Sequence, residues 1–162
     1  MHFLFLLLLV WGGPIPQPER KDLQTPCRLQ QNHKASKADF EAVMGEIAAG
    51  WNQNNAERAA ACFSEDATYT SVPNVQARKG RAALYEWFGG RNGCPRKMSM
   101  EWHHLLFDPG QQIGVGEYTF SYDVRTHGLV IVKIRDGLVS NWREYEHESK
   151  LSWSEMIGDN QF

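Results

Sequence analysis

The chain has 162 residues, of which 42% are hydrophobic and 12% aromatic, and its formal net charge is -2 at pH 7. This is the composition of an ordinary globular protein, so we expect one folded domain with one core. The basic residues form no long run and no stripe among aromatics, which argues against nucleic acid as a partner.

The N-terminus begins with an apolar run from Phe3 to Trp11. The run is shorter than the roughly 20 apolar residues that cross a bilayer, so it predicts no stable membrane anchor and is typical of a signal peptide. Residues 1–20 are therefore predicted to be a signal peptide and the start of a linker, in a secreted or periplasmic protein. No Lys or Arg precedes the run and no A-x-A site follows it, so a buried N-terminal strand or a misassigned start is the alternative. The polar, proline-containing stretch that follows predicts a flexible linker over residues 21–35, ahead of a domain at 36–162.

Three cysteines, Cys27, Cys62 and Cys94, share no C-x-x-C spacing and no zinc-site pattern. In an exported chain one disulfide is possible and one thiol is left over, and the spacing leaves the pairing open. Cys62 follows three alanines in a helical pattern, so we expect a small buried side chain there rather than a nucleophile. The sequence predicts no metal site and no cofactor.

The regular part of the sequence begins at residue 36. Ser36 and Asp39 form an S-x-x-D capping box, and apolar residues then recur at helical spacing as far as Trp51, which predicts a helix. Asn55 can cap a second, shorter helix. A third helix is predicted over residues 81–88, ahead of a pair of glycines.

One strand is predicted before the third helix and four after it, at residues 66–72, 98–107, 113–122, 129–135 and 138–147. The turn signals Asp-Pro-Gly and Asp-Gly between the later strands predict hairpins. The element order is therefore ααβαββββ, with helices confined to one side of a bent antiparallel sheet. This order predicts an α+β fold.

The last strand contains NWREYEHE, in which neither alternate face is apolar. In the preceding strand, the even positions from 130 to 134 are apolar and should face inward. A regular hairpin through the two-residue turn at 136–137 would then place Trp142 and Glu144 on the outside. A bulge after the turn would bring both inward, and bulges are common beside functional sites. The two-residue period leaves both arrangements open.

The WREY motif at residues 142–145, the segment DATYTSVPNVQARKGR and the element order resemble the SnoaL-like branch of the nuclear transport factor 2 superfamily. The resemblance covers residues 36–162. It implies a cone-shaped, curved antiparallel sheet wrapped around helices, with a deep, mostly apolar pocket for a small lipophilic molecule. It also implies a homodimer formed through the outer face of the sheet.

Limonene-epoxide-hydrolase-like members of this superfamily carry W-R-D-Y on the last strand and Y-x-N-x-P on the first. The residues at the matching positions of this chain are Trp142, Arg143, Glu144 and Tyr145, and Tyr69, Ser71 and Pro73. The resemblance implies that Tyr69, Ser71 and Glu144 hold a water molecule beside an aromatic wall at Trp142. It therefore favours the inward orientation, with a phase shift at or after the turn at 136–137. A buried carboxylate has a raised pKa and can accept a proton near neutral pH.

The chain departs from the epoxide hydrolases at their Arg-x-Asp pair, because the nearest stretch, GEYTFSY, has Tyr118 and Phe120 instead. Epoxide hydrolysis by that mechanism is therefore not expected. The remaining hydrogen-bond donors that we consider for the pocket are Tyr69, Tyr118, His103, His104 and His127. A core tyrosine with a satisfied hydroxyl or a neutral core histidine would give the same pattern. We expect one histidine of the 103–104 pair, taken as His104, to face the pocket, and His127 and Glu146 to lie in solvent.

Two functions fit these residues. The first is a cofactor-independent hydrolase, lyase or isomerase with Glu144 as general base. The second is a non-catalytic binder or carrier of a small lipophilic ligand. In both, the expected lining residues are Trp142, Tyr118, Phe120, Trp87 and His104. A dimeric scaffold with an incidental cavity is a third alternative, which the polar residues at pocket positions disfavour.

Overall fold

The computed structural model describes Cys27 and residues 34–72 and 77–161, so the expected signal peptide and Pro73 lie outside the described residues. The elements follow in the order α1 (Lys37–Asn52), α2 (Ala56–Ala61), β1 (Phe63–Val72), β2 (Arg78–Lys79), α3 (Arg81–Trp87), η1 (Gly90–Asn92), β3 (Ser99–Asp108), β4 (Ile113–Ser121), β5 (Arg125–Arg135), β6 (Leu138–Glu148) and α4 (Trp153–Ile157). The predicted α+β order of helices and longer strands is confirmed. The elements β2, η1 and α4 were not predicted, because two to five residues are too few to show a period.

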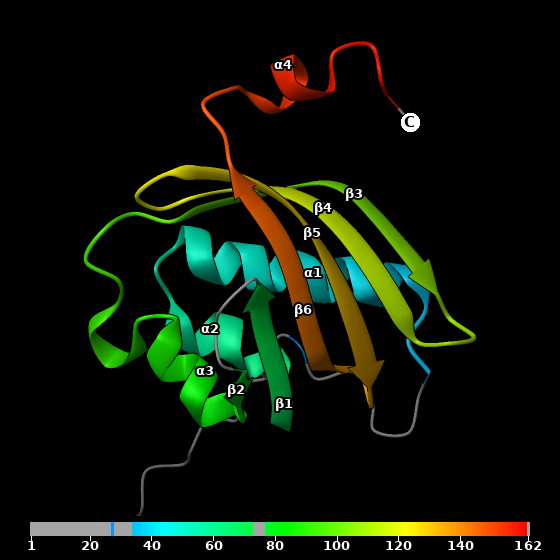
Figure 1. Ribbon diagram of the computed structural model, residues 1–162. Coiled ribbons are helices and arrows are strands. Elements are labelled where there is room, and N and C mark those ends of the chain that lie inside the picture. Colours follow the sequence, from blue (N-terminus) through cyan, green and yellow to red (C-terminus); the bar gives the residue numbers. More distant parts are fainter. Residues whose placement is uncertain (1–26, 28–33, 73–76, 162) are drawn as a thin grey trace, which may run out of the picture.

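The described strands form one curved sheet in the order β2-β1-β6-β5-β4-β3 (Figure 1). Four of its neighbouring pairs are antiparallel, whereas β1 and β6 run parallel. The sheet is thus mostly antiparallel, with one parallel pair between the first strand and the last. This pairing places residues about 75 positions apart side by side, with Tyr69 opposite Trp142 and Ser71 opposite Glu144.

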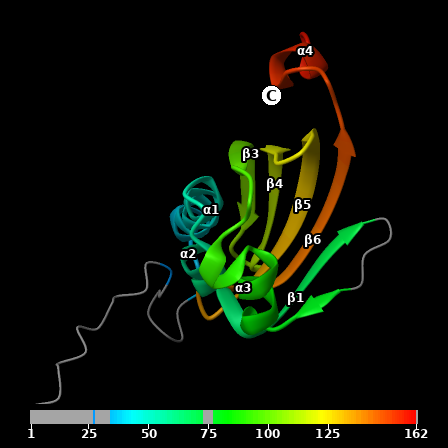
Figure 2. The same ribbon diagram turned by 90° about the vertical axis from the view of Figure 1, so that its left-hand side faces the viewer.

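Helices α1 and α2 lie on one side of the sheet, and α3 packs against α2 and β1 (Figure 2). The predicted capping box at Ser36 and Asp39 is present and begins α1, whose apolar stripe, from Phe40 to Trp51, is buried against the sheet. Helix α4 stands apart from these three helices, beyond the ends of the strands in Figure 2, and its Trp153 stacks on His103 at the outer face of the sheet. Within the described part of the chain, no helix is long and apolar enough to span a membrane.

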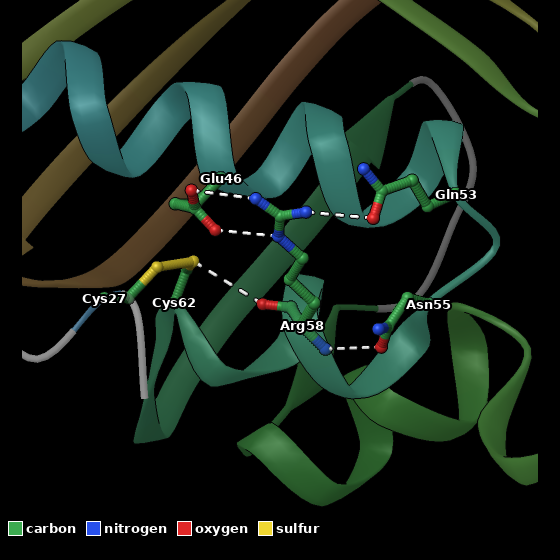
Figure 3. A network of polar contacts seen from close by, with 6 residues as sticks. All are labelled: Cys27, Glu46, Gln53, Asn55, Arg58 and Cys62. Carbon is green, nitrogen blue, oxygen red and sulfur yellow. Dashed lines mark hydrogen bonds and ion pairs between the residues drawn. A yellow bond between two sulfur atoms is a disulfide. The ribbon is translucent and has the colours of Figure 1, made fainter. Parts of the chain in front are cut away.

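Arg58 of α2 joins this helix to α1 (Figure 3). Its guanidinium donates to both carboxylate oxygens of Glu46 on α1, at 2.7 and 2.9 Å, and to the amide oxygen of Gln53 at 2.9 Å. A two-pronged pairing of this kind fixes the angle between helices better than a single contact. The end of α1 is thereby held against α2.

A disulfide joins Cys27 to Cys62, a pairing that the sequence left undecided (Figure 3). Cys94 keeps a free thiol. Cys62 is fully buried at the C-terminal end of α2, as expected for a small core side chain. Ala35 is also buried, and its backbone forms two hydrogen bonds with the side chain of Gln112. The expected linker is therefore tied to the domain at these two points.

Candidate active site

A cavity of about 280 Å³ opens between the helices and the inner face of the sheet. Its lining comes from α1, α3, the segment after η1 and four strands. The lining residues are Trp51, Tyr69, Ser71, Trp87, Phe88, Cys94, Met98, Met100, Tyr118, Phe120, Tyr122, Glu144 and Glu146. Most of these are aromatic or carry sulfur, and the polar atoms are hydroxyls and carboxylates. The pocket therefore has the character of a site for a small, largely apolar molecule.

A bulge in β6 directs Glu144 into this cavity. Asp136 and Gly137 both have positive φ, as a tight two-residue hairpin turn requires, and the register is regular at the turn. The register then shifts so that Lys133 pairs with Asn141, leaving Ser140 as the extra residue. Beyond the bulge, Trp142 and Glu144 face inward, so the predicted phase shift is confirmed.

The Glu144 side chain is buried, with 8% of its surface exposed, and both of its carboxylate oxygens accept hydrogen bonds. The Tyr69 hydroxyl donates to Oε1 and the indole N–H of Trp142 donates to Oε2, each at 2.8 Å. Burial raises the pKa of the Glu144 carboxyl above its ordinary value, although these two donors oppose the shift. The structure therefore holds a carboxylate that is less acidic than a glutamate in water.

Two tyrosine hydroxyls stay protonated beside this carboxylate. Burial and the negative charge of Glu144 raise the pKa of both Tyr69 and Tyr118. The Tyr118 hydroxyl lies 3.4 Å from Oε2 of Glu144 and 3.4 Å from Oε2 of Glu146. The charge of Glu146 also raises the pKa of Glu144. The site therefore combines two carboxyl groups with two hydroxyl donors.

The three residues expected to hold a water molecule, Tyr69, Ser71 and Glu144, lie together on the pocket lining. Ser71 stands opposite Glu144 in the parallel β1–β6 pair, and its hydroxyl lowers the pKa of Glu144 as a hydrogen-bond donor. Trp142 lies behind the lining rather than on it, since 1% of its surface is exposed. Its ring stacks on that of Tyr69, with centroids 5.5 Å apart. Trp142 thus positions Tyr69 and Glu144.

Among the other expected lining residues, Tyr118, Phe120 and Trp87 do line the cavity, whereas His104 does not. In β3 the register shifts after Trp102, so that His103 becomes an extra residue and His104 pairs with Glu117. His104 Nδ1 lies 2.7 Å from a carboxylate oxygen of Glu117 on the outer face of the sheet. The prediction for His104 was wrong because it assumed a regular strand.

The outer face carries two further histidines beneath α4. His103 Nε2 lies 2.7 Å from the hydroxyl oxygen of Thr119, and its ring stacks on Trp153 with centroids 3.9 Å apart. His127 was expected in solvent, but only 2% of its surface is exposed. Its Nε2 lies 3.0 Å from the carbonyl oxygen of Leu151, in the segment that leads to α4. The expectation failed because Leu151 and Trp153, which pack on His127 from the C-terminal segment, were not predicted to do so.

The sequence reasoning missed several lining residues. Trp51 was assigned to the helix core, Glu146 to solvent, and the sulfur-containing residues and Tyr122 received no role. Glu146 is exposed as expected, yet it lines the pocket because it follows Glu144 by two residues on the same strand face. That spacing is the signal that would have found it. Among the described residues, no group of three or more His, Cys, Asp or Glu is placed to hold a metal ion.

Comparison with solved structures identifies the fold. An NTF-2-like protein of unknown function from Burkholderia xenovorans LB400 matches with a TM-score of 0.61 and 15% identity, over 78% of this chain and 97% of that one. A candidate ketosteroid isomerase from Kribbella flavida DSM 17836 matches with a TM-score of 0.58 and 21% identity, over 75% and 89%. An LEH-like epoxide hydrolase from M. tuberculosis matches with a TM-score of 0.55 and 17% identity, over 68% and 84%. At these identities the likeness concerns the fold.

Among curated proteins, none matches this sequence. The family model described as SnoaL-like domain matches residues 45–142, which is more than half of the chain and runs from α1 to the middle of β6. The element order and the mostly antiparallel sheet agree with that match. The chain belongs to the SnoaL-like domain family and has the NTF2-like fold.

Proposed function

We propose that this protein is a cofactor-independent enzyme, in the hydrolase, lyase or isomerase range, that acts on a small lipophilic molecule with Glu144 as general base. The observation that carries the proposal is the position of Glu144. It is a carboxylate with 8% of its surface exposed, on the lining of an aromatic pocket, with hydroxyl donors on either side. Perturbed carboxyl groups in such pockets are typical of acid–base sites.

The general-base role follows from the hydrogen bonds of Glu144. Oε1 accepts one bond, from Tyr69, and a carboxylate oxygen has two lone pairs, so it can also accept a proton from water or from a substrate C–H group. Its raised pKa makes it a stronger base than a carboxylate in water. Ser71, on the same lining, can orient the water or substrate. A low-dielectric aromatic surround strengthens each of these interactions.

In this proposal, Tyr118 is the hydrogen-bond donor that acts together with the base. Its pKa is raised by burial and by the neighbouring carboxylates, so it remains an O–H donor. A preorganised hydroxyl can donate to the oxygen on which negative charge develops when Glu144 removes a proton. Among the described residues that line the pocket there is no Arg-x-Asp pair, so the proposal does not include epoxide opening by the mechanism of the limonene-epoxide-hydrolase-like enzymes.

A second candidate function is that of a non-catalytic binder or carrier of a lipophilic ligand. It is favoured by the fact that each carboxylate oxygen of Glu144 accepts a hydrogen bond from a protein donor, as in a purely structural buried carboxylate. We also propose export to an oxidising compartment, which the Cys27–Cys62 disulfide supports. A homodimer formed through the outer sheet face is a further proposal, and size measurements in solution test it.

Incubation of the purified protein with a panel of lactones, epoxides and enones, followed by mass spectrometry, tests the proposal. We expect conversion of at least one class and a loss of about 10²- to 10⁴-fold in Glu144→Gln, because this is the usual contribution of a general base. Glu148→Gln is the matched control, since Glu148 is exposed on the same strand and does not line the pocket. Conversion that survives Glu144→Gln contradicts the general-base role. Binding without conversion across the panel favours the carrier.

A further inference from the structure

The charged side chains on the described pocket lining are all carboxylates. Glu144 and Glu146 both belong to the lining, whereas no Lys, Arg or His is among the lining residues in the described part of the chain. Neither carboxylate forms an ion pair with any described residue. The pocket is therefore a negatively charged region without a matching cation of its own.

The hydroxyl groups near the two carboxylates do not neutralise them. The Tyr118 oxygen lies 3.4 Å from an oxygen of each, but a hydroxyl has a single O–H and donates to one acceptor at a time. Glu146 also accepts from the Thr126 hydroxyl at 3.0 Å, and it remains exposed where the pocket meets solvent. The oxygens of Glu146 therefore have room for a further donor, and a charged donor would be bound most strongly.

The rest of the pocket suits a cation with an apolar body. The faces of aromatic rings attract cations, and Trp is the best of them. Trp87 is 52% exposed, but its ring already carries the guanidinium of Arg78, whose central carbon lies 3.3 Å from the ring centroid, so a ligand cation would meet the other aromatic rings of the lining. Arg78 itself is not on the pocket lining. Deeper in the pocket, Trp51 and Phe120 provide apolar surface.

We propose that the ligand of this pocket is an apolar molecule that carries one protonated amine, with the ammonium group paired to Glu146 and the apolar body held among the aromatic side chains. Pairing at the exposed Glu146 lets the ammonium keep part of its hydration and leaves Glu144 beside the body of the ligand. The charge of Glu144 adds attraction at longer range. A ligand with a carboxylate is repelled by both groups. The inference rests on the proposed function only in taking this pocket as the ligand site.

Three probes with the same skeleton test the inference: 4-phenylbutylamine, 4-phenylbutan-1-ol and 4-phenylbutanoate, titrated into the full chain by calorimetry. One partly exposed ion pair together with a cation–aromatic contact is worth roughly 1–2 kcal/mol, so we expect the amine to bind about tenfold more tightly than the alcohol. The carboxylate should bind most weakly. Glu146→Gln should remove most of the preference for the amine, because it should lower the affinity for the amine far more than the affinity for the alcohol. Glu148→Gln should change neither.

Equal affinity for amine and alcohol, no binding of any probe, or an amine preference that survives Glu146→Gln would overturn the inference. These results are separate from those of the turnover panel. Conversion of neutral compounds that depends on Glu144, without any preference for amines, retains the proposed function and rejects the amine. Tight amine binding without conversion in any class supports the amine and favours the carrier over the enzyme.

Discussion

The hydrogen bond between Tyr69 and Glu144 gives the site its most direct test, through the substitution Tyr69→Phe. The change removes only the hydroxyl, which donates to Glu144 Oε1 at 2.8 Å. The ring can keep its stacked position on Trp142, where the two planes lie within 8° of parallel. Any loss of stability therefore reports on the hydrogen bond rather than on packing.

The expected loss depends on the charge of Glu144. A hydrogen bond to a charged group contributes about 1.5–3 kcal/mol, and one between neutral groups about 0.5–1.5 kcal/mol. The folded-state pKa of Glu144 is raised, so the folded protein holds this proton to higher pH than the unfolded chain does, and stability from this group is lost as pH rises through the folded-state pKa. Titration of this carboxyl from its charged form at high pH to its neutral form at low pH should therefore lower the effect of Tyr69→Phe from the larger range to the smaller. A comparison of about pH 7.5 with roughly pH 4, on either side of the ordinary glutamate value, detects this change.

Urea denaturation followed by tryptophan fluorescence at both pH values measures these losses. Tyr122→Phe is the matched control, because it also removes one hydroxyl from the pocket lining and its hydroxyl has no hydrogen-bond partner among the described residues. We expect the control to change the free energy of unfolding by less than about 0.5 kcal/mol at either pH. A loss in Tyr69→Phe that is independent of pH, or no larger than that of the control, would refute the reasoning.

Three further predictions concern the supports of the site. Gly128→Ala places a methyl group in space that the ring of Tyr118 occupies. It should lower the free energy of unfolding by about 1–3 kcal/mol and weaken probe binding in calorimetry. Unchanged binding would show that the ring moves freely. Cys62→Ser removes a disulfide between residues 35 positions apart, which restricts the unfolded chain. The substitution should lower the free energy of unfolding by about 3–4 kcal/mol in urea denaturation. A loss below about 1 kcal/mol would argue against this effect on the entropy of the unfolded chain. Trp153→Ala should speed hydrogen exchange in α4. Acidification should lower the protection factors of the α4 amides, because burial lowers the pKa of His103, and the stability present above the ordinary histidine pKa of about 6.5 is lost as the pH falls from there through the lowered folded-state pKa. Equal protection factors at about pH 7.5 and 5.5, corrected for the slower intrinsic exchange in acid, would contradict this.

Local signals in the sequence predicted the parts of the fold that depend on local chemistry. The capping box at Ser36, the cap at Asn55 and the Asp136-Gly137 turn all occur where expected, because each satisfies or terminates the backbone within a few residues. The parallel neighbour of β6, the disulfide partner of Cys62 and the covering of the outer face depend on contacts between distant segments. A single sequence carries no local signal for such contacts.

The candidate site was predictable only through the family resemblance, because the strand period left the orientation of Glu144 open and a regular hairpin would have pointed it outward. Ser140 supplies the reason. Its hydroxyl donates to the carbonyl oxygen of Lys133 at 3.2 Å, which provides a partner for a backbone group at the point where the ladder is interrupted. Nothing in the residues around Ser140 distinguishes it beforehand from an ordinary strand serine. A bulge is visible only in the pairing of a strand with its neighbour, and a single sequence does not give that pairing.

The two bulges together determine which chemistry the pocket has. The extra residue in β6 turns Glu144 inward, and the extra residue in β3 turns His104 outward, to Glu117. A regular β3 would continue the inward face from Trp102 to His104 and bring an imidazole towards the pocket, where it would compete with Glu144 as a base and, when protonated, offset its charge. With His104 on the other face, the described lining is left with carboxylates and hydroxyls. The two bulges together therefore make Glu144 the base of the proposed reaction and leave the pocket with the negative charge that favours an amine.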